Sequence, residues 1–238
     1  MPASLSSGSN SEKIIFKKKL HHSKNADIFA NTVRKNNIDM GIAERRLKEK
    51  KKVKSAILKT GWKMVKETGW ESLSLRKIAD AIEYSVPVIY DHFANKEAIL
   101  TEFSNKGYKL LSKKVQKARE KHQDPYEQLK VIADAYWDFA LKNREYYQLI
   151  FGVGMPSCEG GKCAEDKTSF DFLVMESINE AILNSKQPDT NPCLKYYTYC
   201  SILHGFVSIK IMGNSPVPGE LDKMVLKDAI NGFIKNLD

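Results

Sequence analysis

The chain has 238 residues, of which 42% are hydrophobic and 28% are charged, and its formal net charge at pH 7 is +9. It contains no run of about 18 apolar residues and no apolar leader at its N-terminus, so we predict neither a transmembrane helix nor a signal peptide. These features predict a cytoplasmic globular protein without a membrane partner, whose four cysteines are thiols and not disulfides.

The charge is unevenly distributed along the chain. Residues 1–123 hold 27 Lys and Arg against 13 Asp and Glu, whereas residues 124–238 hold 11 against 16. A basic front half joined to an acidic back half indicates two tasks, and the basic half favours a polyanionic partner such as nucleic acid. A solvated lysine-rich surface is the alternative explanation.

Residues 1–39 show no sustained helical period, and the first of them are rich in serine. We predict that this segment is disordered or is an extension ahead of the ordered protein, which then starts near Met40. A basic arm that contacts a nucleic-acid backbone is the alternative.

From about residue 43 onward the apolar residues follow a helical period without strand alternation, which predicts an all-α fold. The first helix, 43–68, is expected to end at Gly69, a typical C′ residue. Asn95 and Asp124 are expected N-caps, and Glu127 is expected to complete a capping box. The later helices are expected at two short segments within 74–93 and at residues 95–121, 124–142, 144–151, 167–185, 191–212 and 220–237, with a glycine-rich loop at 152–166.

The stretch "SLRKIADAIEYSVPVIYDHFANKE" at 74–97 has an apolar rhythm that stops at residues 83–85 and then restarts. This pattern predicts two short helices that cross at a tight turn, with Ser74 and Ser85 as their N-caps. Such a helix-turn-helix places its second helix in the major groove of DNA. A helical hairpin without any DNA role is the alternative.

This segment resembles the DNA-binding domain of the TetR family of transcriptional regulators over about residues 45–103. The family pattern is present at Gly69, Ser74, Arg76, Ile78, Ala79, Ser85, Ile89, Tyr90, His92, Phe93, Lys96 and Glu97. Glu83 stands where the family usually has a glycine, so we expect a strained or differently wound turn. Val86, Pro87 and Val88 fill positions that are often Lys, Gly and Thr.

The resemblance implies roles in DNA binding for individual residues. Ser74, Tyr90 and Lys96 are predicted phosphate contacts, and Arg76 is predicted to read a guanine edge. Ser85 caps the reading helix, and His92 contacts phosphate or packs. Residues Val86, Pro87 and Val88 are predicted to meet thymine methyl groups.

The resemblance also implies a helix-turn-helix domain at 40–103 and a helical regulatory and dimerisation domain at 104–238, connected by the helix at 95–121. We expect a homodimer, formed through residues 191–213 and 219–237, on a near-palindromic double-stranded operator. A repressor released by an apolar or aromatic effector is the expected function.

Aromatic residues gather in the back half and indicate an apolar cavity, although a plain hydrophobic core explains most of them. His204 is more often a core histidine than a ligand contact. The predicted effector-binding residues are Tyr136, Trp137, Phe139, Tyr147, Phe151, Phe170, Cys200 and His204.

No phosphate-binding loop, metal-binding motif or catalytic triad is evident, so we predict no enzyme activity, no catalytic residue, no metal and no cofactor. Cys158 and Cys163 lie in the glycine-rich loop and leave a redox-sensing regulator as an alternative. A helical interaction protein that does not bind DNA is a third possibility.

Overall fold

The computed structural model describes residues 41–152, 165–213 and 221–237. Within these ranges every regular element is a helix and no strand is present, in agreement with the predicted all-α class. The chain divides into two units, Met1–Ala56 and Ile57–Asp238. The segment predicted to be disordered, 1–39, lies outside the described residues, as do Cys158 and Cys163.

The first helix is described from residue 41 to residue 68 and ends at Gly69, as predicted. Gly69 has a φ of 83°, and its N–H donates to the Val65 carbonyl oxygen at 2.8 Å. Its ψ is 176°, so it does not adopt the left-handed helical conformation, but glycine reaches this positive φ without the steric cost that a Cβ brings. Inside the helix, a Cβ on Gly61 would lie 3.1 Å from Leu73 Cδ1 and 3.3 Å from Ile78 Cδ1, so the missing side chain allows a close approach.

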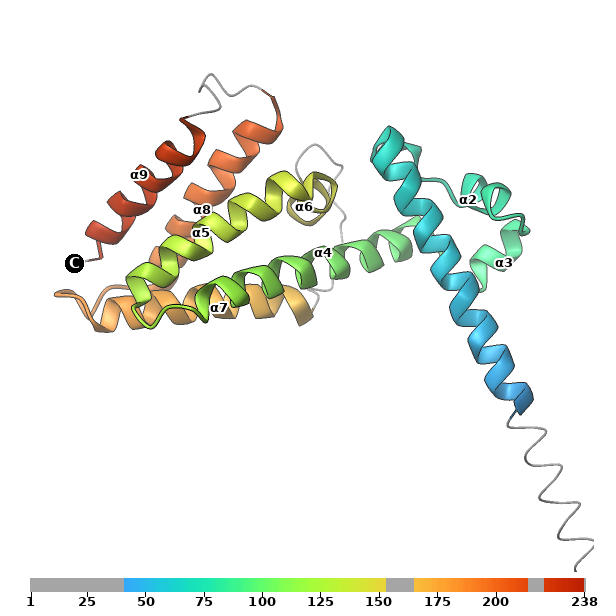
Figure 1. The fold of residues 1–238 in the computed structure, drawn as a ribbon, viewed down its shortest axis with the longest axis horizontal. Helices are drawn as coiled ribbons and strands as arrows, with labels where there is room; N and C mark the ends of the chain where they lie inside the picture. Colours follow the sequence, from blue (N-terminus) through green and yellow to red (C-terminus); the bar gives the residue numbers. More distant parts are fainter. Residues whose placement is uncertain (1–40, 153–164, 214–220, 238) are drawn as a thin grey trace, which may run out of the picture. The chain divides into compact units, whose positions relative to one another are not determined.

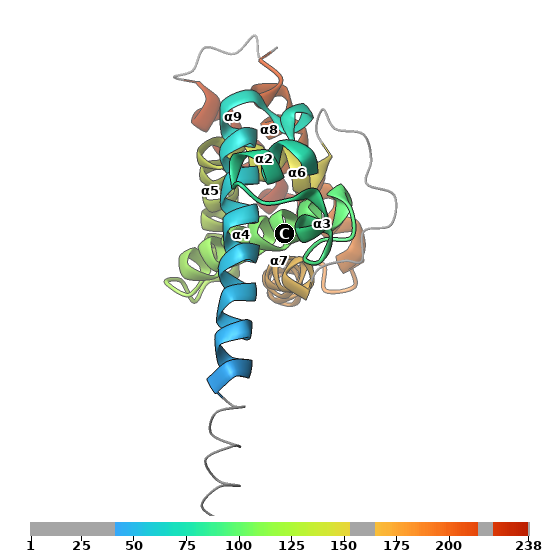
Figure 2. The same cartoon turned by 90° about the vertical axis from the view of Figure 1, so that its right-hand side faces the viewer.

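The predicted helix-turn-helix is present. A 3-10 turn, η1 (Trp70–Ser72), precedes α2 (Leu75–Ala81) and α3 (Val86–Tyr90), which contact each other. Figure 2 shows both short helices. The side chains that hold the pair together are fully or almost fully buried: Ile78, Ala79, Ile89 and Phe93.

The two serines sit at the predicted N-cap positions but do not act as side-chain caps. Ser74 precedes α2 and Ser85 precedes α3, and neither side chain makes a capping hydrogen bond. The expectation of hydroxyl caps was therefore wrong, although the helix starts were placed correctly. Each helix is short and is held by the packing of its apolar face instead.

Glu83 lies in the turn between α2 and α3 and has a φ of 59°, the one positive value of a non-glycine residue in the described chain. A left-handed conformation costs a residue with a Cβ about 1–2 kcal/mol. The strain that the sequence predicted at this position is therefore present in the backbone.

Replacing Glu83 with glycine is expected to raise the free energy of unfolding by about 0.5–1 kcal/mol, because the relief of strain exceeds the extra entropy of glycine in the unfolded chain. Urea denaturation followed by circular dichroism measures the change. Glu83→Ala removes the same charge but keeps the Cβ, so it is the matched control and should show no comparable gain. Equal stabilities of the two variants would contradict the assignment of strain.

The remaining helices form the larger part of the second unit. They are α4 (Lys96–Arg119), α5 (Pro125–Lys142), α6 (Arg144–Phe151), α7 (Glu165–Leu183), α8 (Pro192–Ile211) and α9 (Asp222–Lys235). Helix α4 packs against α5, α6 and α7, while α5 also contacts α8 and α9 (Figure 1). The central α5 therefore brings the short α6 and the long α7 and α8 around one apolar interior.

Polar side chains cap the starts of three of these helices, and the caps at Asn95 and Asp124 were predicted from the sequence. Asn95 accepts from the Ala98 N–H at 2.9 Å, Asp124 from two N–H groups at 3.3 Å, and Asn191 from the Cys193 N–H at 2.9 Å. The expected capping box was wrong. The Glu127 carboxylate instead accepts from Lys130 Nζ at 2.6 Å, and this hydrogen bond lowers the pKa of Glu127.

None of the described helices is long and apolar enough to cross a lipid bilayer.

Candidate DNA-binding surface and effector cavity

The predicted DNA contacts lie on α2, on α3 and at the start of α4. Arg76 is exposed on α2, and Tyr90 exposes 54% of its surface at the end of α3. Ser85 and Pro87 are exposed, whereas Ser74, Val86, Val88, His92 and Lys96 are half-buried. The structure thus gathers all nine residues within one short motif and leaves part of each one's surface accessible.

The α3 helix itself carries no charged side chain, since its sequence is VPVIY. A basic residue that the sequence reasoning did not single out, Lys77, is exposed beside Arg76 on α2. Its exposed position in the same turn as Arg76 is the signal that could have found it. In the other unit, the basic run at 44–54 is exposed over most of its helix.

His92 is half-buried, and its Nδ1 atom is buried without a hydrogen-bond partner in the described part of the chain. That nitrogen is not accessible to a phosphate. The geometry thus favours packing for this face of the ring over the alternative of phosphate contact.

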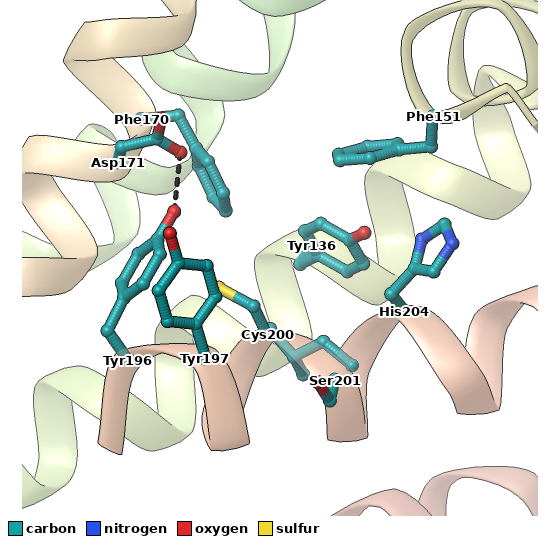
Figure 3. Close-up of a pocket in the computed structure, with 10 residues that line it drawn as sticks. Tyr136, Phe151, Phe170, Asp171, Tyr196, Tyr197, Cys200, Ser201 and His204 are labelled. Atoms are coloured by element: carbon teal, nitrogen blue, oxygen red, sulfur yellow. Dashed lines mark hydrogen bonds between the residues drawn. The ribbon is translucent and has the colours of Figure 1, made fainter. Parts of the chain in front are cut away.

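A cavity of about 300 Å³ lies among α5, α6, α7 and α8 (Figure 3). Aromatic rings form most of its wall: Tyr136 and Phe151 pack with ring centroids 5.7 Å apart, and Tyr136 and Phe170 with centroids 5.9 Å apart. The lining residues are Tyr136, Phe151, Phe170, Asp171, Tyr196, Tyr197, Cys200, Ser201, Leu203 and His204.

Five of the eight predicted effector residues line this cavity: Tyr136, Phe151, Phe170, Cys200 and His204. Three do not. Trp137 is buried and stacks on Phe206 with centroids 5.2 Å apart, and Phe139 is 1% exposed in the core. Tyr147 is fully buried, and its hydroxyl lies 2.8 Å from His204 Nδ1, so it supports the histidine from behind.

The sequence reasoning missed half of the cavity wall. Tyr196, Tyr197 and Ser201 lie on α8, three to eight residues before His204. The i, i+3, i+4 spacing of a helix would have found them once Cys200 and His204 had been chosen. Asp171, which follows Phe170 on α7, and Leu203 complete the set.

The polar groups of the cavity differ in charge. Burial lowers the pKa of His204, which keeps the ring neutral near pH 7, and burial raises the pKa of the Cys200 thiol to about 11. Tyr196 donates to Asp171 Oδ1 at 2.7 Å, and burial together with this bond raises the pKa of Tyr196. Cys200 is therefore a protonated thiol with low reactivity, which does not favour a redox role for it.

Helix α6 touches the cavity with one side and the first helix with the other. Phe151 lines the cavity, whereas the Tyr146 ring stacks on Trp62 with centroids 3.9 Å apart and an interplanar angle of 16°. Lys66 Nζ also donates to Glu145 Oε2 at 2.8 Å. A shift of α6 would therefore be felt at residues 62–66 of the helix that packs on the helix-turn-helix.

Helix α4 approaches α6 closely as well. A Cβ on Gly107 would lie 3.1 Å from Ile150 Cγ2 and 3.3 Å from Tyr146 Cβ. The Tyr108 hydroxyl donates to the Ile150 carbonyl oxygen at 3.0 Å. The connector helix predicted from the sequence is thus in direct contact with the helix that carries Phe151.

Two family models match the chain. Residues 57–109 match the model described as bacterial regulatory proteins, tetR family, and residues 129–227 match the tetracyclin repressor-like C-terminal domain. The first match contains the helix-turn-helix, and the second contains the cavity. A comparison with curated protein sequences finds no match.

Solved structures share the fold at low sequence identity. A protein of unknown function from Rhodococcus sp. RHA1 has a TM-score of 0.65 at 20% identity, covering 77% of this chain and 94% of that one. PfmR, a TetR family transcriptional regulator from Thermus thermophilus, has a TM-score of 0.53 at 21% identity, covering 75% and 97%. AibR, solved with isovaleryl coenzyme A and operator DNA, has a TM-score of 0.50 at 19% identity, covering 75% and 96%.

The helix-turn-helix and the separate aromatic cavity define a DNA-binding regulator that responds to a ligand. Both family models fit the parts of the chain that carry these two features, so the chain belongs to the TetR family of bacterial regulatory proteins. It is a transcriptional regulator and not an enzyme.

Proposed function

We propose that the protein is a homodimeric repressor that binds a near-palindromic operator and is released by an apolar or aromatic small molecule. The observation that carries this proposal is the position of α6, which lines the cavity through Phe151 and contacts the first helix through Tyr146 and Glu145. Helix α6 thereby contacts both the cavity and the helix that packs on the DNA-binding motif.

An exposed apolar face on α8 and α9 supports the homodimer. Its large apolar members are Leu194, Tyr197 and Ile209 on α8, Met212 directly after α8, Leu221 directly before α9, and Met224 and Val225 on α9, each at least 39% exposed. A second copy of the chain would cover this face by a two-fold arrangement of the same helices. Two recognition motifs would then meet half-sites about 10 bp apart.

Two glycines on these helices add a separate argument. Gly205 in α8 and Gly232 in α9 are exposed, and a Cβ on either would meet nothing within 4 Å. A glycine inside a helix costs about 1 kcal/mol relative to alanine, and packing within the protomer gives no reason for that cost. Close approach of the backbone of a second copy of the chain would explain why glycine is present at both positions.

Effector release requires that the effector binds the DNA-incompetent shape more tightly than the DNA-competent one. A coupling of about 1–3 kcal/mol is typical of such switches. We propose that an effector against Phe151 displaces α6, which moves the first helix through Trp62 and moves α4 through Gly107 and Tyr108. The connector helix α4 then transmits the displacement to the helix-turn-helix.

The DNA contacts are proposed to divide into positioning and reading. Lys96 is the first residue of α4, where a positive charge is unfavourable for the helix dipole, so phosphate contact is a reason for its presence. Arg76 is exposed on α2 and can present its planar fork to a guanine edge.

Selection of bound sequences from random DNA, followed by gel shifts, tests both the function and this division. Lys96→Ala is expected to weaken binding to all sequences and to lower the salt slope by about one unit. Arg76→Ala is expected to relax preference at one base pair at a cost of about 1–3 kcal/mol. Lys186→Ala, which removes an exposed charge outside the motif, is the control and should change neither quantity.

Failure of the wild-type protein to select any DNA sequence would contradict the repressor proposal. Equal losses of the Arg76 and Lys96 variants on selected and random DNA would contradict only the division of roles.

A further inference from the structure

The geometry points to the charge of the effector: we propose that the cavity binds an apolar or aromatic ammonium ion, with Asp171 facing the cation and aromatic rings around it. This inference rests on the proposed function, which leaves the effector's charge open. It concerns the end of the cavity formed by α7 and the first half of α8.

The first argument is the charge of the wall. Among the described residues that line the cavity, Asp171 is the one acidic side chain, and there is no Lys or Arg. His204 is held neutral near pH 7 because burial lowers its pKa. A carboxylate or phosphate on the effector would meet Asp171 without a compensating cation from these residues, whereas an ammonium ion would meet an opposite charge.

The second argument is the arrangement of rings next to the carboxylate. Figure 3 shows Tyr196, Tyr197 and Phe170 grouped at the end of the cavity that holds Asp171. The rings of Tyr196 and Tyr197 meet edge to face with centroids 5.3 Å apart. Aromatic faces attract cations, and quaternary ammonium groups are bound by several such rings together.

A purely structural role for Asp171 is the competing explanation, because it accepts a hydrogen bond from the Tyr196 hydroxyl at 2.7 Å. That bond uses one of about four acceptor sites on a carboxylate. An asparagine could also accept it, so the hydrogen bond alone does not require a charge at this position. Among the side chains that the structure describes, no salt bridge joins Asp171 to a basic residue.

Three probes of equal chain length separate charge from apolarity: decyltrimethylammonium, decanol and decanoate. Isothermal titration calorimetry of the full chain is expected to give an affinity for the ammonium ion at least ~10-fold higher than for the alcohol, with decanoate weakest. Asp171→Asn is expected to remove this preference, because it keeps the acceptor for Tyr196 but not the charge. Asp189→Asn, an exposed change outside the cavity, is the matched control and should keep the preference.

A second variant keeps the test valid if Asp171→Asn unfolds. Tyr196→Phe leaves the carboxylate in place and is expected to retain the preference for the ammonium ion. Wild-type protein that binds alcohol as tightly as the ammonium ion would overturn the inference, as would no binding of any probe, or an Asp171→Asn variant that keeps the wild-type preference.

Operator affinity measured in the same samples separates this inference from the proposed function. Release of DNA by decanol or decanoate but not by the ammonium ion overturns the inference and leaves the function standing. An ammonium ion that binds with the expected preference but leaves operator affinity unchanged supports the site and contradicts effector release.

Discussion

Replacing Gly205 with leucine is expected to convert the proposed dimer into monomers that are at least as stable as the wild-type protomer. A Cβ at this position meets nothing within 4 Å in the protomer, and leucine is a better helix former than glycine. The free energy of unfolding of the monomer should therefore rise by about 0.5–1 kcal/mol. Stability of the protomer should thus rise while association of the protomers falls, a combination that a general loss of folding would not produce.

The loss of association should be large. Overpacking at an interface costs about 1–3 kcal/mol for each added side chain, and a two-fold axis introduces two of them. The dimer dissociation constant should thus rise by about 30-fold to 10⁴-fold, and operator affinity should fall steeply because a monomer contacts one half-site.

Sedimentation velocity at micromolar protein measures the association, and thermal unfolding measures the stability. Lys113→Leu adds the same side chain to an exposed position of α4 and is the control that should remain dimeric. A Gly205→Leu protein that still sediments as the wild-type dimer would show that the face on α8 and α9 is not the interface.

Removing the Tyr146 ring is expected to disconnect the effector cavity from DNA release. Tyr146 is 4% exposed, and its ring stacks on Trp62. It also lies close to Gly107 of α4, where an added Cβ would be 3.3 Å from Tyr146 Cδ1. Tyr146→Ala should lower the free energy of unfolding by about 3 kcal/mol, a value typical of large-to-small changes in a core. Effector binding should persist, while effector-induced loss of operator affinity should fall at least ~10-fold, because α6 then moves without displacing Trp62.

The matched control is Tyr146→Phe. The Tyr146 hydroxyl is buried and has no hydrogen-bond partner among the described residues, and burial raises its pKa to about 12, so it remains protonated. Phenylalanine keeps the ring stack and removes the unsatisfied group, which is neutral or stabilising by up to about 1 kcal/mol. Gel shifts with and without effector compare the variants, and full release by Tyr146→Ala would exclude this route.

Local signals in the sequence were sufficient where one residue determines a boundary. Gly69 ends the first helix, and Asn95 and Asp124 start α4 and α5 with their own side chains, as predicted. Prediction failed where two local partners compete. The Glu127 carboxylate can accept a hydrogen bond either from a backbone N–H at the helix start or from the Lys130 ammonium group three residues later. It forms the ion pair with Lys130.

Prediction of the cavity wall failed for a related reason, because it depends on contacts between residues far apart in the sequence. A helical period identifies the buried face of α5 but not which part of that face meets another helix and which part meets a void. Trp137 and Tyr136 are neighbours in sequence and both are buried, yet Trp137 stacks on Phe206 while Tyr136 lines the cavity. Only the packing of α6, α7 and α8 around α5 separates these roles.

The positions of the tryptophans make the proposed motion optically visible. The chain has three tryptophans. Trp62 stacks on Tyr146, and its ring centroid lies 6.0 Å from that of Trp70, whereas Trp137 packs against Phe206. A Trp137→Phe protein would therefore keep two indoles, both grouped at the contact between the first helix and α6. Its intrinsic fluorescence would report the displacement of Tyr146 from Trp62 without an attached dye, and stopped-flow mixing could time that displacement against the departure of DNA.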